Sequence, residues 1–440
     1  MVKYEPVIGL EVHVELNTKS KMFCRCSAEY FGQKPNTHTC PVCLGLPGAL
    51  PYINGEAINK CMQIGLALNC QVSEKSLIER KNYFYPDLAK GYQISQYRWP
   101  LNVNGWIEIE DDSGQVSKIR INRAHQEEDT GKLTHVNGVT LIDFNRSGVP
   151  LVEIVTEPDF TNSSQIRDYA KKLQQIFRYL GVSEADMEKG QMRLEANVSV
   201  RPEGQRELPS YRVELKNINS FRFMVAAVEY EIKRQIEALE RGEKLAQETR
   251  GWNEDKKCTY VQRSKEEAHD YRYFPEPDLP ELILSKEKIQ KIKDTLPELP
   301  ANKLKRFEVE FGLTKAQAVV LIDTKEMAQF FEETVEHGKK HNVDAKQIAN
   351  FIINKKIDIE TALPTQVIEE ILGKTVGVIS NEEELEKLAN QAIAENPKAV
   401  KDYKKGKETA LQALIGGVMR LSKGKADISK LKLILEKLLD

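Results

Sequence analysis

Several features that would assign a protein to a familiar class are missing from this sequence. No apolar run approaches the ~20 residues that a membrane-spanning helix needs, so we expect no membrane segment. The chain starts with Met1-Val2-Lys3 and shows no signal or transit pattern, which predicts a cytoplasmic protein. The formal net charge over 440 residues is only −2, so any nucleic acid would have to be bound by a local basic surface.

A glycine-rich phosphate loop is missing as well. Gly373-Lys374-Thr375 resembles the end of such a loop, but the required glycine five residues earlier is Ile368. A helical pattern precedes this stretch, where a phosphate loop would need a strand. If the protein binds ATP, we therefore expect the nucleotide on a different scaffold.

Cysteine is scarce, with seven residues in the whole chain, which is too few for a disulfide scaffold. Four of them lie within one short stretch, residues 24–43, as a C-x-C pair and a C-x-x-C pair: Cys24, Cys26, Cys40 and Cys43. Thiolates at this spacing in a reducing compartment favour a structural Zn²⁺ over free thiols, and His38 could replace one cysteine. Four cysteine ligands would leave no position for substrate, so we assign this site to folding.

The chemically richest stretch is residues 8–16, Ile-Gly-Leu-Glu-Val-His-Val-Glu-Leu. Its alternation predicts a strand with four apolar side chains on one face and Glu11, His13 and Glu15 on the other. Carboxylates this close repel one another unless a cation lies between them, and oxygen ligands with one imidazole suit Mg²⁺ or Mn²⁺. For this strand alone, a solvated face is an equal alternative.

Similar strands recur, which favours the chemical interpretation. Alternation predicts strands near residues 118–123, 150–157, 193–201 and 212–217, and two amphipathic helices follow near 162–180 and 224–239. An antiparallel sheet covered by helices on one face would leave the other face open. Acids that could hold metal and bases that could hold phosphate would interleave there: Glu11, His13, Glu153, Glu195, Glu214, Arg193, Arg201, Arg212 and Lys216. The alternative is a surface lattice of salt bridges.

Two loops add candidate binding groups. Residues 81–99 alternate aromatic side chains, among them Tyr83 and Tyr85, with amide, hydroxyl and charged groups, a composition typical of base stacking. A core loop with satisfied hydroxyls is about equally compatible with this composition. Residues 125–132, His-Gln-Glu-Glu-Asp-Thr-Gly-Lys, could form a polar turn or place a carboxylate on a metal.

The C-terminal part has a different character. From about residue 300 the periodicity is helical, and residues 401–440 contain ten Lys or Arg and five Asp or Glu. A small basic helical module in a weakly acidic chain suggests contact with a phosphate backbone, although a solvated helical face is equally compatible. We predict an α+β protein with an antiparallel-sheet domain over residues 1–293, a helical middle region over 294–375 and a basic helical tail domain over 376–440.

Six separated motifs resemble the B subunit of the aspartyl/glutamyl-tRNA amidotransferase, in that family's order. They are IGLEVHVEL, RKNYFYPDLAKGYQISQY, EEDTGK, IDFNRSGVPLVEIVTEPD, VELKNINS and DYRYFPEPD. The resemblance is dense over about the first 290 residues and looser beyond them. The stretch from about 345 to 380 looks shorter than the corresponding region of the family.

The resemblance implies a ligase that acts on tRNA mischarged with Glu or Asp. ATP with Mg²⁺ or Mn²⁺ would phosphorylate the side-chain carboxyl, and ammonia would displace the phosphate to give Gln-tRNA(Gln) or Asn-tRNA(Asn). The ammonia would come through a channel from the amidase (glutaminase) partner, the A subunit, while the small C subunit would brace the pair. The sheet domain would be a glutamine-synthetase-like cradle. The family's metal ligands carry over to Glu11, His13, Glu127 and Glu128, with Glu153 as a neighbour.

From these patterns and the resemblance we assign the remaining roles. Lys81 and Arg193 join Glu11, His13, Glu127, Glu128 and Glu153 in catalysis, and ATP contacts fall to Arg146, Arg201, Arg212, Lys216, Tyr83 and Tyr85. The chain has no Ser-rich amidase stretch and no cysteine in a nucleophile context, so ammonia must come from elsewhere. Two alternatives remain: a small-molecule ligase or kinase that is indifferent to tRNA, and a non-catalytic tRNA-binding scaffold.

Overall fold

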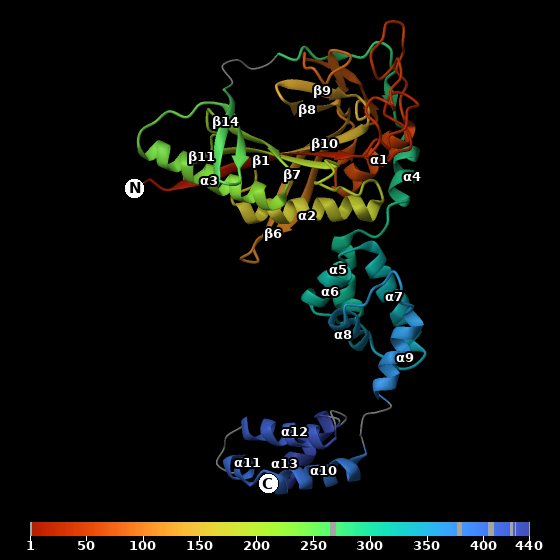
Figure 1. The fold of residues 1–440 in the computed structure, drawn as a ribbon, viewed down its shortest axis with the longest axis vertical. Helices are drawn as coiled ribbons and strands as arrows, with labels where there is room; N and C mark the ends of the chain where they lie inside the picture. The colour runs from red at the N-terminus through yellow and green to blue at the C-terminus, as the bar shows by residue number, and fades with distance from the viewer. Residues whose placement is uncertain are drawn as a thin grey trace. The chain divides into compact units, whose positions relative to one another are not determined.

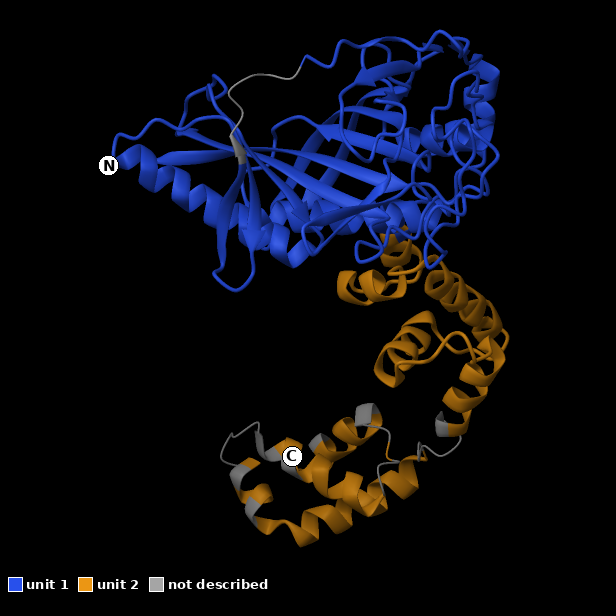
Figure 2. Ribbon diagram, turned by 45° about the horizontal axis from the view of Figure 1, so that its top comes forward, with its two compact units in different colours: residues 1–303 blue, residues 304–440 orange. Residues whose placement is uncertain are grey.

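The computed structural model of the chain describes residues 2–264, 270–375, 381–403, 409–422, 426 and 428–439. Contacts divide the chain into two compact units, Met1–Lys303 and Leu304–Asp440 (Figure 2). Over these described ranges, no helix combines the length and apolarity that a membrane crossing requires.

A nine-stranded sheet forms the first unit, in the order β14-β13-β12-β11-β1-β10-β7-β6-β2. All neighbours are antiparallel except β12 and β13. Its strands are β1 (Tyr4–Glu15), β2 (Gln71–Val72), β6 (Asn102–Glu110), β7 (Val116–Glu128), β10 (Pro150–Thr156), β11 (Met192–Pro202), β12 (Val213–Ile218), β13 (Glu248–Asn253) and β14 (Cys258–Ser264).

The two faces of this sheet differ as the alternation in β1 predicts. Ile8, Leu10, Val12 and Val14 are at most 1% exposed and belong to the main hydrophobic core. The helices α1 (Gly55–Ala67), α2 (Ser163–Leu180) and α3 (Phe221–Glu240) contribute to the same core, and α2 and α3 run along one side of the sheet (Figure 1). The prediction of an α+β protein with a large, mainly antiparallel sheet is confirmed.

Smaller sheets lie around the large one. The order β15-β4-β5 joins β15 (Phe274–Pro275), β4 (Glu79–Asn82) and β5 (Tyr92–Ser95), and two further pairs are β16 (Leu282–Ile283) with β3 (Lys75–Ser76) and β8 (Lys132–Val136) with β9 (Val139–Asp143). Side chains of β4 fasten the segment before and after β15. Asn82 donates to the carbonyl of Arg272 at 2.9 Å, and Arg80 forms a bidentate salt bridge with Glu276.

From residue 286 the described chain is helical. The helices are α4 (Lys286–Asp294), α5 (Pro300–Glu310), α6 (Lys315–Leu321), α7 (Lys325–Lys339), α8 (Ala345–Lys355), α9 (Pro364–Thr375), α10 (Glu382–Glu395), α11 (Pro397–Tyr403), α12 (Thr409–Leu421) and α13 (Ile428–Leu439). Two separate hydrophobic clusters lie within the second unit, one over 307–371 and one over 385–439. The predicted helical C-terminal part is confirmed, and the boundaries proposed within it stay a prediction. Lysines 404, 405, 407, 423 and 425 lie outside the described residues.

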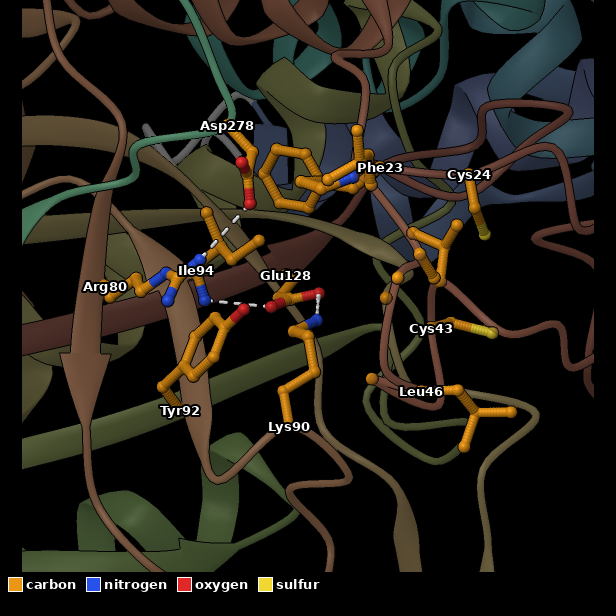
Figure 3. A pocket seen from close by; sticks show the side chains of 17 residues that line it. Phe23, Cys24, Cys43, Leu46, Arg80, Lys90, Tyr92, Ile94, Glu128 and Asp278 are labelled. Atoms are coloured by element: carbon orange, nitrogen blue, oxygen red, sulfur yellow. Dashed lines mark hydrogen bonds and ion pairs between the residues drawn. The ribbon is translucent and has the colours of Figure 1, made fainter.

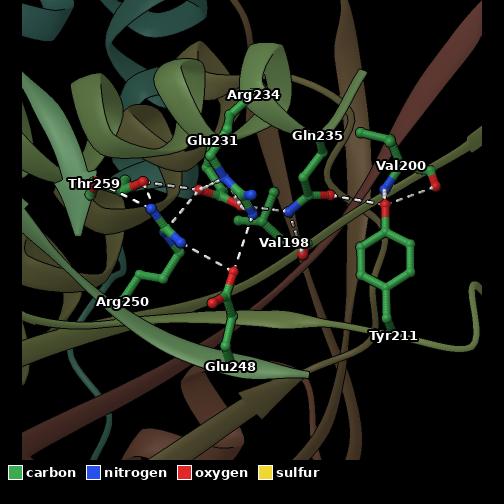
Figure 4. Close-up of polar contacts among 9 residues, drawn as sticks. All are labelled: Val198, Val200, Tyr211, Glu231, Arg234, Gln235, Glu248, Arg250 and Thr259. Carbon is green, nitrogen blue, oxygen red and sulfur yellow. Dashed lines mark hydrogen bonds and ion pairs between the residues drawn. The ribbon is translucent and has the colours of Figure 1, made fainter. Parts of the chain in front are cut away.

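A buried polar network fastens α3 to the edge of the large sheet (Figure 4). Glu231 is fully buried and accepts hydrogen bonds from Arg234 at 2.6 Å, Gln235 at 2.8 Å and Thr259 at 3.0 Å. Arg250 lies 3.5 Å from the same carboxylate. A buried carboxylate is tolerated only when its partners are in place, so this network fixes where β13 and β14 lie against α3.

We predict that Glu231→Ala lowers the free energy of unfolding by about 3 kcal/mol, since Arg234 and Arg250 lose their fully buried partner and keep only Glu248. Denaturant melts of the full chain measure this loss. The matched control is Glu240→Ala, because Glu240 is exposed on the last turn of the same helix, and its cost should stay below about 0.5 kcal/mol. Equal costs for the two variants would contradict the structural role of Glu231.

Candidate metal and phosphate site

Three strands bring one imidazole and two buried carboxylates together on the sheet face opposite the apolar core. His13 pairs in register with Glu153 of β10, and Glu153 pairs with His125 of β7, which places Glu127 one step along the same face. His13 Nε2 lies 3.8 Å from an oxygen of Glu127 and 3.8 Å from an oxygen of Glu153. These three residues offer ligand atoms within 4.8 Å of one another, which fits one divalent cation.

Electrostatics in this group fit a site for positive charge. Burial opposes ionisation of Glu153, but the His125 ring 3.2 Å away, together with His13 and Lys81, holds the pKa of Glu153 well below its usual range. Burial would lower the pKa of His125, but Glu153 and Glu127 raise it above its ordinary value. The Nδ1 atoms of His13 and His125 are buried without a hydrogen-bond partner among the described residues. The Nε2 atoms of the two rings, and not these Nδ1 atoms, face the carboxylates, so a cation bound between Glu127 and Glu153 would be held by Nε2.

A second acidic group lies beside the first. Glu11, Glu195 and Glu214, from β1, β11 and β12, offer oxygens within 4.8 Å of one another. Lys216 Nζ lies 2.7 Å from Glu195 and 3.2 Å from Glu214, and Asn197 donates to Glu11 at 2.9 Å. Burial and the Glu153 and Glu195 carboxylates raise the pKa of Glu11, a repulsion that a divalent cation would relieve.

Four tyrosines in ring contact, which we call the aromatic wall, lie next to the first group: Tyr83, Tyr97, Tyr271 and Tyr273. Lys81 of β4 lies 5.7 Å from the ring centroid of Tyr83 and 5.2 Å from that of Tyr271. Burial alone would lower the pKa of Lys81, but Glu127 and Glu153 raise it, so its ammonium stays charged beside those carboxylates. The rings of Tyr273 and Tyr97 stack with their centroids 4.7 Å apart. Burial, Glu127 and Glu153 raise the pKa of Tyr273, against the opposing effect of Lys81. The structure therefore brings Lys81 and Tyr83 to the site, whereas Tyr85 is 59% exposed in the loop after β4.

Two of the predicted basic residues converge on one buried carboxylate. Arg193 Nη2 lies 2.9 Å and Arg146 Nε 3.5 Å from the same oxygen of Asp129, which directly follows β7. Arg146 also donates to the carbonyls of Thr130 and Gly131. Arg193 pairs in register with His13, so this guanidinium borders the first acidic group and could face a phosphate.

One predicted basic residue lies far from the acidic groups. Arg201 pairs with Glu5 at 2.6 Å, and Glu5 precedes Glu11 by six strand residues, or about 20 Å along β1. Alternation does not indicate how far along the strand a side chain lies. Arg212 is exposed, directly precedes β12 and lies two residues before Glu214 of the second group. The assignment of both arginines to ATP contacts stays a prediction.

Glu128 needs correction, because it does not join Glu127. The strand β7 continues through both residues, so their side chains leave it on opposite sides. Glu128 accepts from Lys90 Nζ at 2.7 Å and from the backbone N–H of Ile94 at 2.8 Å (Figure 3). It lines a cavity of about 240 Å³ whose walls include Arg80, Tyr92, Leu46 and Cys43. Residues 125–128 are the end of β7 and do not form a polar turn, which was one of the two alternatives for residues 125–132.

The four predicted cysteines do come together. Their sulfur atoms lie within 4.8 Å of one another, and the Cys40 and Cys43 sulfurs are 3.8 Å apart. A hydrogen bond from Cys24 and the charge of Lys21 lower the pKa of the Cys43 thiol to about 4, against the opposing effect of burial. The cluster could therefore bind a metal ion. His38 is not part of this group of four ligand atoms.

Sequence reasoning missed one residue of this site, His125, which contacts both carboxylates of the first group. Glu195 and Glu214 were predicted on the polar face, but their grouping with Glu11 was not. His125 precedes Glu127 by two positions, so the period of the strand was a signal that could have included it. No comparable signal groups Glu11 with β11 and β12, because that grouping depends on strand order.

Comparison with known proteins gives a consistent answer. A family model described as the GatB/GatE catalytic domain matches residues 6–290, and one described as the GatB domain matches residues 343–439. Three relatives are each named as the B subunit of an aspartyl/glutamyl-tRNA(Asn/Gln) amidotransferase. That of Carboxydothermus hydrogenoformans is 46% identical, with 97% of both chains covered. That of Thermoanaerobacter pseudethanolicus is 47% identical at the same coverage, and that of Thermotoga petrophila is 45% identical over the whole of both chains.

The alignment with the Thermotoga petrophila protein spans 489 residues, so that relative has residues which the present 440-residue chain lacks. The matched catalytic region contains both acidic groups, the aromatic wall and the four cysteines. The identity extends over nearly the full length of chain and relatives alike. The chain therefore belongs to the GatB family, among proteins named as the B subunit of aspartyl/glutamyl-tRNA(Asn/Gln) amidotransferase.

Proposed function

We propose that this chain activates the side-chain carboxyl of Glu-tRNA(Gln) or Asp-tRNA(Asn) with ATP and directs its amidation to Gln-tRNA(Gln) or Asn-tRNA(Asn). The names of its relatives support the reaction class. The observation that carries the proposal is the pair of acidic groups on the sheet face opposite the apolar core, His13 with Glu127 and Glu153, and Glu11 with Glu195 and Glu214. Basic side chains border both groups.

The chemistry explains why such a face is needed. A free carboxylate is a poor acylating agent, because an oxide or hydroxide would have to leave, and phosphorylation supplies a better leaving group. Carboxylate and polyphosphate repel each other, and Mg²⁺ or Mn²⁺ held by the acidic groups would reduce that repulsion. Lys216, Lys81 and Arg193 lie beside these groups and would stabilise charge on the transferred phosphoryl.

The fold supports the same proposal. A glutamine-synthetase-like cradle would present an open antiparallel face, and here α2 and α3 run along one side of the sheet (Figure 1). The acidic side chains alternate with the apolar residues that face the core, so they lie on the other side. The base of ATP or the 3′ end of tRNA would stack on the aromatic wall of Tyr83, Tyr97, Tyr271 and Tyr273, beside the first acidic group.

We infer partners from the chemistry the chain lacks. Its sequence offers no Ser-rich amidase stretch, so the ammonia would be released in a separate amidase partner, the A subunit, with the small C subunit bracing the pair. The basic tail would bind the mischarged tRNA. We place this reaction in the cytoplasm, where translation occurs.

The four-cysteine cluster would hold Zn²⁺ as a folding element. We predict that chelation of the ion loosens residues 24–43 and lowers the melting temperature of the chain by about 5 °C, if the loop contributes about 2 kcal/mol. Differential scanning calorimetry with and without chelator measures the change. A Cys258→Ser variant should respond like the native chain, because Cys258 lies outside the cluster. A melting curve that chelation leaves unchanged would refute the assignment.

The function is tested by one assay with the partner subunits, ATP, Mg²⁺, glutamine and each mischarged tRNA. The proposal expects Gln-tRNA or Asn-tRNA to form only when ATP and mischarged tRNA are both present. ATP turnover that is indifferent to tRNA would instead favour a small-molecule ligase or kinase. Tight tRNA binding without any ATP turnover would favour a non-catalytic scaffold.

A further inference from the structure

A buried lysine connects the four-cysteine cluster to the site described above. Lys21 is fully buried, and its ammonium nitrogen contacts three acceptors: the carbonyl of His38 at 2.7 Å, the carbonyl of Phe144 at 3.3 Å and the sulfur of Cys43 at 3.7 Å. Lysine is almost never fully buried unless it is paired. No carboxylate is among these three acceptors, so the negative partner next to the ammonium is the thiolate cluster.

The charge of that cluster explains why a lysine is useful there. Four thiolates around one divalent cation carry a net charge of −2, and burying such a charge is costly unless it is compensated. Cys43 already accepts a hydrogen bond from the backbone N–H of Cys40 at 3.1 Å, and the Lys21 ammonium adds a charged donor to the same sulfur. Partners outside the ligand shell orient metal ligands and tune their affinity in this way.

The same lysine contacts the 143–148 turn, which carries Arg146. Residues 143–148 are fastened to the cysteine loop by further hydrogen bonds. Asn145 accepts from the N–H of His38 at 2.7 Å, and Met22 donates its N–H to the carbonyl of Gly148 at 2.7 Å. Gly148 has a φ of +88°, and a Cβ there would lie 3.4 Å from Lys21 Cδ, so the turn packs directly on the lysine stem.

This turn also determines where the Asp129 group lies. Arg146 within the turn contacts Asp129, and the N–H of Gly148 donates to the carbonyl of Asp129 at 2.9 Å. Asp129 in turn holds Arg193 on the polar face of the sheet. A continuous chain of contacts therefore runs from the cysteine cluster through Lys21 and the turn to a guanidinium beside the first acidic group.

We propose that Lys21 is a positioning residue that compensates the charge of the metal-bound cysteine cluster and ties that cluster to the 143–148 turn. The inference rests on the Zn²⁺ proposed for the four cysteines and not on the proposed reaction. Zn²⁺ would contribute only its charge and its hold on the thiolates. Lys21 would hold the 143–148 turn against the cluster, and the turn would in this way keep Asp129 and Arg193 in place.

The test compares Lys21→Met with Lys19→Met in the full chain, because Lys19 is exposed two residues away. In Lys21→Met we expect Zn²⁺ transfer to a chromogenic chelator to be at least ~10-fold faster, as for other lost partners of metal ligands. With Co²⁺ in place of Zn²⁺, the thiolate-to-metal charge-transfer band should move to longer wavelength, since a sulfur without a charged donor gives up electron density more readily. Lys19→Met should match the native chain in both measurements.

Hydrogen exchange tests the connection to the turn. Amides of residues 129–131 and 143–149 should exchange faster in Lys21→Met, and chelation of the native chain should produce the same pattern. If Lys21→Met does not fold, Lys21→Gln keeps a donor without charge and should still shift the Co²⁺ band and speed Zn²⁺ loss. Native metal retention, native spectra and native exchange in either variant would overturn the proposal. A native chain that binds no metal would instead refute the Zn²⁺ assignment.

Discussion

Replacing one ligand of the first acidic group should lower the rate of amidation by about a thousandfold. We expect this loss for His13→Ala, Glu127→Gln and Glu153→Gln alike, because each removes one of three atoms that would hold the same cation. Removing a single electrostatic stabiliser of a transition state costs about 10²–10³ in turnover, and the loss of the ion itself would cost at least as much. Single-turnover amidation with preformed complex and mischarged tRNA measures the effect.

Two controls make this prediction specific. Glu157 directly follows β10, the strand of Glu153, and its carboxylate accepts a hydrogen bond from Asn122, which lies outside the group. Glu157→Gln should therefore keep near-native turnover. The affinity for tRNA should stay within about twofold of native in every variant, because the exchanged groups act on phosphoryl transfer. A double variant should be little worse than either single variant, since residues that act as a unit are not additive. Native turnover in Glu127→Gln would show that a cation held by this group takes no part in the reaction.

Deleting the chain after residue 380 should weaken tRNA binding by about a hundredfold and flatten its dependence on salt. Residues 401–440 hold ten basic and five acidic side chains, and each lost phosphate contact removes about 0.7–0.9 from the slope of log affinity against log salt. Loss of three to four contacts should therefore be visible as a slope change of about three. Filter binding across a salt series measures both quantities.

A point variant separates charge from folding in this prediction. Lys401 is exposed on α11, and Lys401→Glu should reduce the salt slope by about one, whereas Lys171→Glu on α2 should not. The turnover at saturating tRNA should be unchanged in the truncated chain, because both acidic groups lie outside the deleted segment. Unchanged affinity and slope in the truncated chain would remove the tail from the recognition of tRNA.

The polar face of the sheet could be predicted from the sequence because strand alternation is a local property. Glu11 and His13 alternate with fully buried apolar residues, and the structure keeps that alternation through β1. The resemblance paired Glu128 with Glu127, whereas the strand continues through both residues and sends their carboxylates to opposite sides. Local patterns therefore predicted which residues lie on the face, but not which of them come together there.

Strand order and register depend on contacts between distant segments, which a single sequence does not show. The pairing of β1 with both β10 and β11 decides which acids meet His13 and which meet Glu11. The parallel pairing of β12 with β13 could not be foreseen either. The distance of Arg201 from the acidic groups was missed for a different reason: it lies six residues from Glu195 on the same strand, about 20 Å away, and the face it occupies does not show that distance.

The most direct test of the central claim is anomalous diffraction from crystals of the assembled enzyme grown with Mn²⁺ and a non-hydrolysable ATP analogue. We expect an anomalous peak at bonding distance from His13, Glu127 and Glu153, and density for the analogue's phosphates between this peak and the Glu11, Glu195 and Glu214 group. Nucleotide and Mn²⁺ bound elsewhere on the chain, with the His13 group bare, would contradict it.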